Sequence, residues 1–156
     1  MYDIGTYTVA PIKVVWRRMD RQITAAVVGE LDDLYLGKRP VIPQETCVLI
    51  EAQSTNEAHY LCALLNSAVS NFIVKFHSVR GGKGFGTPSM LDYLRLRRFT
   101  ASNPEHEELA NLSRKAHQVA ARDGDVADIQ NAIDETAAAR YGMGTSELRA
   151  IIQALG

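Results

Sequence analysis

STNEAHYLCALLNSAVSNF, residues 54–72, is the clearest helical stretch of the sequence. Ser54 and Glu57 have the spacing of a capping box, in which each side chain bonds to a backbone amide of the first helical turn. Apolar side chains then recur at steps of three and four residues, which predicts a helix that buries one face and ends near Asn71. The residues of this apolar stripe are Ala58, Leu61, Cys62, Leu65, Ala68, Val69 and Phe72.

Before this helix, the sequence favours β-strands. Residues 7–19 are rich in β-branched side chains, and their alternation places Val14 and Trp16 on one face. Lys13 and Arg17 fall on the opposite face of this predicted strand. Residues 23–31 are predicted to form a second strand, although their alanines leave a helix possible. A connecting loop is expected over residues 32–40, followed by a buried strand over residues 47–50.

The segments after the helix are predicted to return to extended structure. Residues 71–79 are expected to finish as a strand, and residues 80–88, RGGKGFGTP, to form a glycine-rich loop. The tail of residues 89–99, SMLDYLRLRRF, alternates apolar and basic side chains, which predicts a short strand. Its inward residues are Leu94 and Leu96, and its outward residues are Arg95 and Arg97.

From Asn103 onward the pattern is helical. Asn103 is a good N-cap, and the glutamates that follow it favour the positive end of a helix dipole. Gly124 and Gly142 then divide the remainder into three helices. We therefore expect an α+β protein, with a mixed sheet body and one amphipathic helix in residues 1–101 and a C-terminal three-helix segment in residues 102–156.

The composition limits the class of protein. The 156 residues are 46% hydrophobic and carry 17 basic and 18 acidic side chains, a net charge of −1, so disorder is not expected. The sequence has no run of 18 apolar residues and no leader-like N-terminus, which argues against a membrane span and against secretion. Cys47 and Cys62 lie among apolar residues and suit a reducing compartment, so we expect a cytoplasmic protein.

The charges are unevenly distributed along the chain. Residues 1–101 carry 12 basic against 9 acidic side chains, a balance of +3, whereas residues 102–156 carry 5 against 9, a balance of −4. Residues 75–98 alone carry six basic side chains and one acidic one, which suits a polyanionic partner. The aromatic residues interleaved there are Phe76, Phe85 and Tyr93, and a second basic cluster around Trp16 consists of Lys13, Arg17, Arg18 and Arg21.

The glycine-rich loop has three interpretations. A Walker loop starting at Gly81 requires lysine where this chain has Thr87, and the GxGxG spacing differs from that of a dinucleotide loop. A flexible turn between two elements is the plain interpretation. The third interpretation fits the neighbouring side chains: backbone without Cβ atoms approaches a polyanion closely, Arg80 and Lys83 neutralise phosphates, and Phe85 contacts a base or sugar.

The remaining motifs give weaker indications of function. Arg95, Arg97 and Arg98 either form a solvated edge strand that is kept from aggregating by its charges, or follow a phosphate backbone. His59 and Cys62 have a metal-like spacing, but no second ligand pair accompanies them, and a buried structural cysteine is the simpler interpretation. The sequence has no recognisable catalytic motif, so we predict no catalytic and no metal-binding residue.

Residues 60–99, YLCALLNSAVSNFIVKFHSVRGGKGFGTPSMLDYLRLRRF, resemble the C-terminal target-recognition (specificity) domain of TaqI-type adenine-specific DNA methyltransferases and of related fused restriction–modification enzymes. The similar features are the amphipathic helix with LLNS at residues 64–67, the polar loop, and a short strand that closes on Phe99. Residues 106–117 resemble the helix that follows this domain in the large fused members. The resemblance therefore covers residues 7–117.

The resemblance implies a mixed α/β domain that contacts bases in the major groove of double-stranded DNA. The chemistry then belongs to a separate catalytic methyltransferase domain, which binds S-adenosylmethionine and flips out the target adenine. That domain carries an Asn-Pro-Pro-aromatic motif, whereas the one Asn-Pro pair here, Asn103-Pro104, is followed by Glu105. The chain is therefore interpreted as a fragment of a larger enzyme, with no cofactor of its own.

The first functional hypothesis is a DNA target-recognition domain, in which Arg80, Lys83 and Arg97 contact phosphates while Phe85 and Thr87 lie near bases. The alternative is a protein-interaction or assembly module whose acidic helical tail docks on another domain or on a second copy. A free-standing small enzyme is a third hypothesis, and no constellation of residues supports it. The candidate DNA-binding residues are Lys13, Arg17, Arg18, Arg80, Lys83, Phe85, Thr87, Arg95, Arg97 and Arg98.

Overall fold

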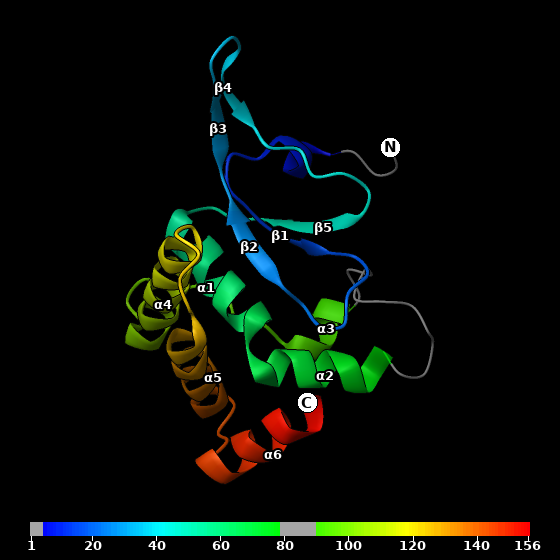
Figure 1. The fold of residues 1–156 in the computed structure, drawn as a ribbon, viewed down its shortest axis with the longest axis vertical. Helices are drawn as coiled ribbons and strands as arrows, with labels where there is room; N and C mark the ends of the chain where they lie inside the picture. The colour runs from blue at the N-terminus through cyan, green and yellow to red at the C-terminus, as the bar shows by residue number, and fades with distance from the viewer. Residues whose placement is uncertain (1–4, 79–89) are drawn as a thin grey trace.

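The computed structural model of the chain describes residues 5–78 and 90–156. In these residues, a three-stranded sheet and a separate β-hairpin precede six α-helices, as Figure 1 shows. The expected α+β class is therefore confirmed.

The sheet has the strand order β2–β1–β5, and both of its pairings are antiparallel. A 3-10 helix at Thr6–Val9 precedes β1 (Lys13–Arg17), so the strand expected over residues 7–19 forms only in its second half. β2 spans Ala25–Val28, where the sequence left a helix open, and β5 spans Cys47–Glu51. β5 confirms the strand predicted just before the first helix, but its residues are half-buried or exposed and not fully buried as expected.

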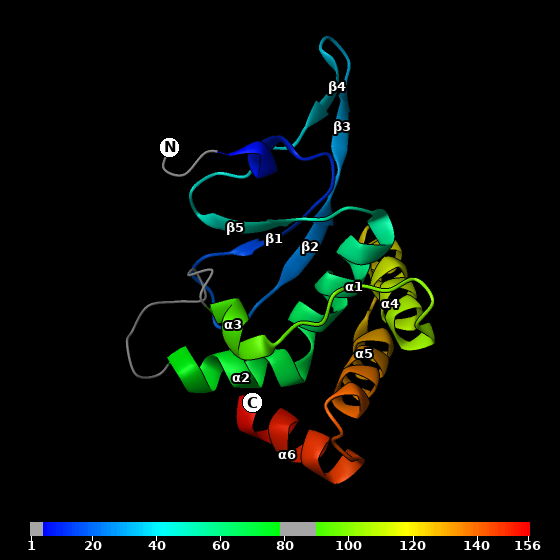
Figure 2. The same cartoon turned by 180° about the vertical axis from the view of Figure 1, so that it is seen from behind.

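β3 (Glu30–Asp33) and β4 (Gly37–Pro40) pair antiparallel and form a hairpin that stands away from the sheet, as both views show (Figures 1 and 2). The prediction of a connecting loop over residues 32–40 is therefore wrong. The Asp33 carboxylate organises the turn, because its Oδ1 accepts two backbone amides of the tip at 2.9 and 2.8 Å. Gly37 follows with a φ of 68°, which favours glycine.

α1 (Thr55–Asn66) lies between the sheet and α4 (Pro104–Ala120), so it is buried on two opposite sides. Its start agrees with the prediction, since the Ser54 hydroxyl accepts the Glu57 N–H at 3.1 Å. The Glu57 carboxylate accepts the N–H of Gln53 at 2.7 Å, one residue before the N-cap. Together these bonds satisfy amides at the beginning of the helix.

The predicted long helix is broken after Asn66, where Ser67 adopts an extended backbone and α2 (Ala68–Ser78) begins. The strand expected over residues 71–79 is wrong, because residues 71–78 continue α2 instead. The buried carboxylate of Asp134, from a distant helix, accepts the first amide of α2 at 2.7 Å. The Ser67 hydroxyl, just before α2, also accepts the Ser70 N–H at 3.3 Å, so the start of α2 has a local cap as well as this bond to a residue far away in sequence.

α3 (Leu91–Leu94) is one helical turn in a region where the sequence favoured a strand. Arg95 ends it in the left-handed region, with φ 44° and ψ 46°, and the chain beyond is irregular. The strand predicted within residues 89–99 is therefore wrong, whereas its alternation is confirmed at Leu94, which is buried, and at the exposed Arg95 and Arg97.

The C-terminal helices begin and end close to the predicted positions. The Asn103 side chain accepts the Glu105 N–H at 2.9 Å and caps α4. α5 (Ala127–Arg140) and α6 (Thr145–Leu155) follow, separated by Gly142 with a φ of 72°. Their apolar faces pack on α1 and α2, so two of the three core clusters contain residues from both halves of the chain.

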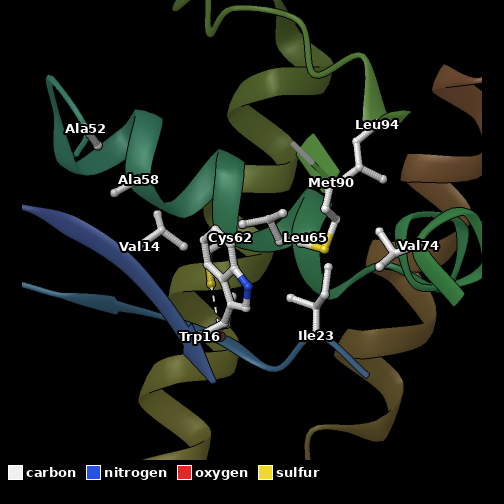
Figure 3. Packing of buried hydrophobic residues seen from close by; sticks show 11 residues of the cluster. Val14, Trp16, Ile23, Ala52, Ala58, Cys62, Leu65, Val74, Met90 and Leu94 are labelled. Atoms are coloured by element: carbon white, nitrogen blue, oxygen red, sulfur yellow. Dashed lines mark hydrogen bonds between the residues drawn. The ribbon is translucent and has the colours of Figure 1, made fainter. Parts of the chain in front are cut away.

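The first core cluster lies between the sheet and the helices and contains residues from both ends of the body. Figure 3 shows its side chains converging, with the fully buried Val14 and Trp16 from β1 and Cys62 and Leu65 from α1. The Cys62 thiol donates to the Ala25 carbonyl of β2 at 3.3 Å. The predicted burial of this cysteine is therefore confirmed.

Helix side chains, not a fourth strand, cover the outer edge of β2. Alternate backbone N–H groups along this edge point away from β1 and bond to α1, α2 and α4. These bonds run from Ile23 to Asn71 Oδ1 (2.6 Å), from Ala25 to Asn66 Oδ1 (2.7 Å) and from Val27 to His117 Nε2 (2.9 Å). The sheet therefore ends here with its edge amides satisfied.

Candidate nucleic-acid interface

The turn between β1 and β2, the C-terminal half of α2, and α3 meet at one end of the molecule. They meet because Ile23, Val74 and Leu94, one from each segment, are buried in the same core cluster (Figure 3). The polar and aromatic side chains of these segments are exposed, and we call this set the basic–aromatic end. It consists of Arg17, Arg18, Arg21, Lys75, Phe76, His77, Tyr93 and Arg95.

The described residues of this end carry a positive charge. Five basic side chains lie there with two acidic ones, Asp20 and Asp92, a balance of +3. The Arg17 guanidinium lies 3.8 Å from the Asp20 carboxylate, yet the Arg17 side chain stays 77% exposed. Exposed ion pairs of this kind contribute little to stability, so the guanidinium is available to an outside anion.

The aromatic residues of this end form a stacked group. The rings of His77 and Tyr93 are 4.1 Å apart between centroids and 6° from parallel. Phe76 meets His77 edge-on at 5.6 Å, and Phe76 and Tyr93 remain 72% and 53% exposed. Exposed aromatic rings beside cations are the surface on which nucleic-acid bases and sugars stack.

A groove of about 630 Å³ adjoins the basic–aromatic end. Arg21 lines it together with Lys75, whose ammonium donates to the Leu155 carbonyl at 2.9 Å. Lys75 therefore caps the C-terminus of α6 and is held in place beside the groove. The residues that line the groove are Asp20, Arg21, Gln22, Thr24, Asn71, Lys75 and Leu155.

The structure removes Lys13 from the exposed basic residues. The predicted alternation placed it on the outer face of β1, but it is only 1% exposed. Its ammonium donates to the backbone carbonyls of Ala10 and Val41, from segments that cover this face of the central strand. Burial lowers the pKa of Lys13. Lys13 is therefore placed as a structural residue, out of reach of a surface ligand.

The arginines predicted to share one strand are separated. Arg95 lies at the end of α3, whereas Arg97 and Arg98 lie on the irregular segment that runs along α1 toward α4 (Figure 2). The Arg97 carbonyl accepts the Tyr60 hydroxyl of α1 at 3.1 Å, which fixes this part of the chain. Both later arginines are exposed, but they are not part of the basic–aromatic end.

The remaining candidates, Arg80, Lys83, Phe85 and Thr87, lie outside the described residues. The structure therefore places only the two elements on either side of them, α2 and α3. Both of these elements contribute side chains to the basic–aromatic end.

The contact between α1 and α4 contains a second group of titratable side chains. His59 Nδ1 lies 3.1 Å from the Ser113 hydroxyl, and the His59 and His117 rings meet edge-on at 5.0 Å. Burial, with smaller contributions from His117 and Arg114, lowers the pKa of His59 to about 4. His117 links β2 to α4, because its Nε2 accepts the Val27 N–H of β2 while its Nδ1 donates to the Ser113 carbonyl within α4 at 2.8 Å.

This second group lacks the features of a reactive site. Burial raises the pKa of the Cys62 thiol to about 11, which disfavours the nucleophilic thiolate. In the described ranges, no three side chains of His, Cys, Asp or Glu come together as the ligands of a metal ion would. His59, Cys62 and His117 are therefore best explained as polar groups that join the sheet, α1 and α4.

Comparison of the chain with protein-family models, with curated proteins and with solved structures gives no match. Of the helices in residues 5–78 and 90–156, none combines the length and the hydrophobicity that a membrane crossing requires.

Proposed function

We propose that this chain is a DNA target-recognition (specificity) domain that binds duplex DNA through the basic–aromatic end. The observation that carries the proposal is the exposed His77–Tyr93 stack, with Phe76 against it, among side chains of net positive charge. A neutral protein-binding surface does not require this charge, whereas phosphate neutralisation does. The resemblance of residues 60–99 to specificity domains points to the same ligand.

The proposed contacts fall into two kinds. Arg17, Arg18 and Arg95 neutralise phosphates and set the position of the domain on the duplex. Phe76 and Tyr93 contact sugars or bases beside them. The segment between α2 and α3, which contains the earlier candidates Arg80, Lys83, Phe85 and Thr87, is proposed to read bases, because it joins the two elements that present the aromatic group.

The parent protein is proposed to be an adenine-specific DNA methyltransferase or a restriction–modification enzyme that acts in the cytoplasm. Its catalytic domain would be the protein partner of this chain and would bind S-adenosylmethionine. The residues described here would then position the duplex for that domain and carry no catalytic group themselves.

The alternative, an assembly module that docks through its acidic helical tail, has less support. Apolar residues of the tail such as Leu109 of α4 and Ile133 of α5 are buried inside the chain. They pack against Tyr60 and Leu64 of α1 in a shared core cluster. The tail therefore uses much of its apolar surface within the chain and leaves Ile152 of α6 as its exposed large apolar residue.

Fluorescence anisotropy with a labelled pool of random duplex DNA tests the proposal. If three phosphates are neutralised, affinity should fall about 40-fold when salt rises from about 50 to about 200 mM, since each contact contributes a slope of about 0.9. Replacing Arg17 and Arg18 together with glutamine should reduce this slope by about two contacts. The matched control is Arg122→Gln, which removes an exposed arginine beyond the end of α4. Equal slopes for the two variants would refute the proposed interface.

A further inference from the structure

The tip of the β3–β4 hairpin exposes large apolar side chains. Leu34 and Tyr35 are each 89% exposed and Leu36 is 62% exposed, although their turn is well formed around the Asp33 carboxylate. Contiguous exposed apolar groups on a structured protrusion mark an interaction surface. Figures 1 and 2 show this tip at the far end of the molecule from α6.

An open groove on the helical side of the molecule is the complementary feature. It measures about 500 Å³ and lies between the outer edge of β2, the start of α2, and the helices α4, α5 and α6. This volume lies in the range of about 300–1,000 Å³ typical of pockets that bury whole apolar groups. Its apolar lining includes Ala26, Ala116, Ala120, Val126, Ile152 and Leu155.

The groove is suited to side chains and not to an added strand. The β2 amides of Ala25 and Val27, and that of Ile23 before them, already bond to helix side chains. Strand addition requires free amides along a sheet edge. An occupant must therefore enter with its side chains, as a protruding apolar tip does.

We propose that the occupant is the hairpin tip of a second copy of this chain, so that two copies exchange tips in a symmetric dimer. The hairpin points away from the helices of its own chain (Figure 1), which places the tip and the groove on different molecules. In a two-fold dimer each tip enters the other copy's groove, and both contacts form together.

The contact area favours this reciprocal arrangement. The side chains of Leu34, Tyr35 and Leu36 together offer roughly 400 Å² of apolar surface. One tip in one groove would thus bury at most roughly 400 Å² on the side of the tip, well short of the ~800 Å² per partner that stable interfaces need. With two reciprocal contacts each copy buries both its tip and its groove, so the closed dimer is favoured over a single contact. The net charge of −1 adds little repulsion between copies.

Size-exclusion chromatography with light scattering on the full chain, across a range of concentrations, tests this proposal. We expect a limiting mass of twice 17.2 kDa. Tyr35→Asp in the tip and Ile152→Asp in the groove should each raise the dissociation constant at least tenfold, since each places a carboxylate in an apolar contact. Val9→Asp, at an exposed apolar residue outside both surfaces, is the matched control and should leave the dimer intact.

The two substituted residues, Tyr35 and Ile152, are exposed, so the variants should keep the native circular dichroism, and a monomeric mass then reports on association alone. A native chain that stays monomeric at every concentration overturns the proposal. So does a dimer that survives either substitution, because it must use another surface. A mass that rises beyond two copies overturns the closed arrangement in favour of open chains.

Discussion

His59 should make the stability of this protein sensitive to acid. Its side chain is 7% exposed in the contact between α1 and α4, with the His117 ring and the Arg114 guanidinium as neighbouring charged or titratable groups. Burial, and then these two neighbours, lower the pKa of His59 from 6.5 to about 4. The native structure therefore holds this imidazole neutral where an unfolded chain would protonate it.

The size of the effect follows from linkage. Well above pH 6.5 the imidazole is neutral in both states and contributes no dependence on pH. As the pH falls from 6.5 toward 4, the unfolded chain binds a proton that the native chain excludes, so the free energy of unfolding decreases. At pH 4.5 the loss should be about 2 to 3 kcal/mol relative to pH 7, because one unit of pKa difference corresponds to about 1.4 kcal/mol.

Other buried groups also respond to acid, so the effect of His59 must be isolated by difference. The pKa of His106 is lowered by burial and then by Arg140, which adds to the loss of stability in acid. Burial raises the pKa of the Asp134 carboxyl, so its uptake of a proton opposes that loss. Comparing the native chain with a His59 variant cancels both contributions.

Urea unfolding, followed by the fluorescence of the single tryptophan, provides the assay, because Trp16 is 1% exposed in the native core. His59→Asn keeps a polar atom near the position of Nδ1 and removes the titration. The stability difference between the native chain and this variant should shrink by about 2 to 3 kcal/mol from pH 7 to pH 4.5. Parallel curves for the native chain and His59→Asn would refute the reasoning.

Two further substitutions test the structural roles of buried charged residues. Lys13→Met should lower the free energy of unfolding by about 1–3 kcal/mol, because the carbonyls of Ala10 and Val41 lose their donor. It should leave the salt dependence of DNA binding unchanged, and a smaller slope in the anisotropy assay would instead make Lys13 a phosphate contact. Asp134→Ala should cost about 1–2 kcal/mol in urea unfolding, because the first amide of α2 loses its acceptor. Asp134→Asn keeps an acceptor oxygen and should cost less than half as much, so equal losses would show that the cap contributes little.

The elements that the sequence predicts correctly are those with local signals. The start of α1 is set by Ser54 and that of α4 by Asn103, and both side chains make the expected caps. The breaks that the sequence analysis misses have weaker local signals. The first amide of α2 bonds to the distant Asp134, although the Ser67 hydroxyl also caps this helix locally. The turn of α3 ends at Arg95 in a left-handed conformation, where the sequence has no glycine.

The same distinction applies to the candidate site. Phe76, Tyr93 and the neighbouring arginines are visible in the sequence as aromatic residues among basic ones, and the structure leaves them exposed. His77 is missed, because in the predicted strand it faces away from Phe76, whereas in α2 the two lie on adjoining sides. Lys13 is misplaced for another reason: β1 is the central strand, and the segments that contain Ala10 and Val41 cover its outer face at Lys13.

The acidic C-terminal helices support the basic–aromatic end and are not a separate module. Lys75 reaches from α2 to the last carbonyls of α6, and the Tyr141 hydroxyl donates to the Leu94 carbonyl at 2.8 Å, at the point where α3 ends. The two elements that carry the His77–Tyr93 stack are thus each held by the C-terminal segment. A division of the chain near residue 101 would remove both supports along with two shared core clusters. The opposite charges of the two halves therefore correspond to the basic–aromatic end and to the acidic helical segment that supports it.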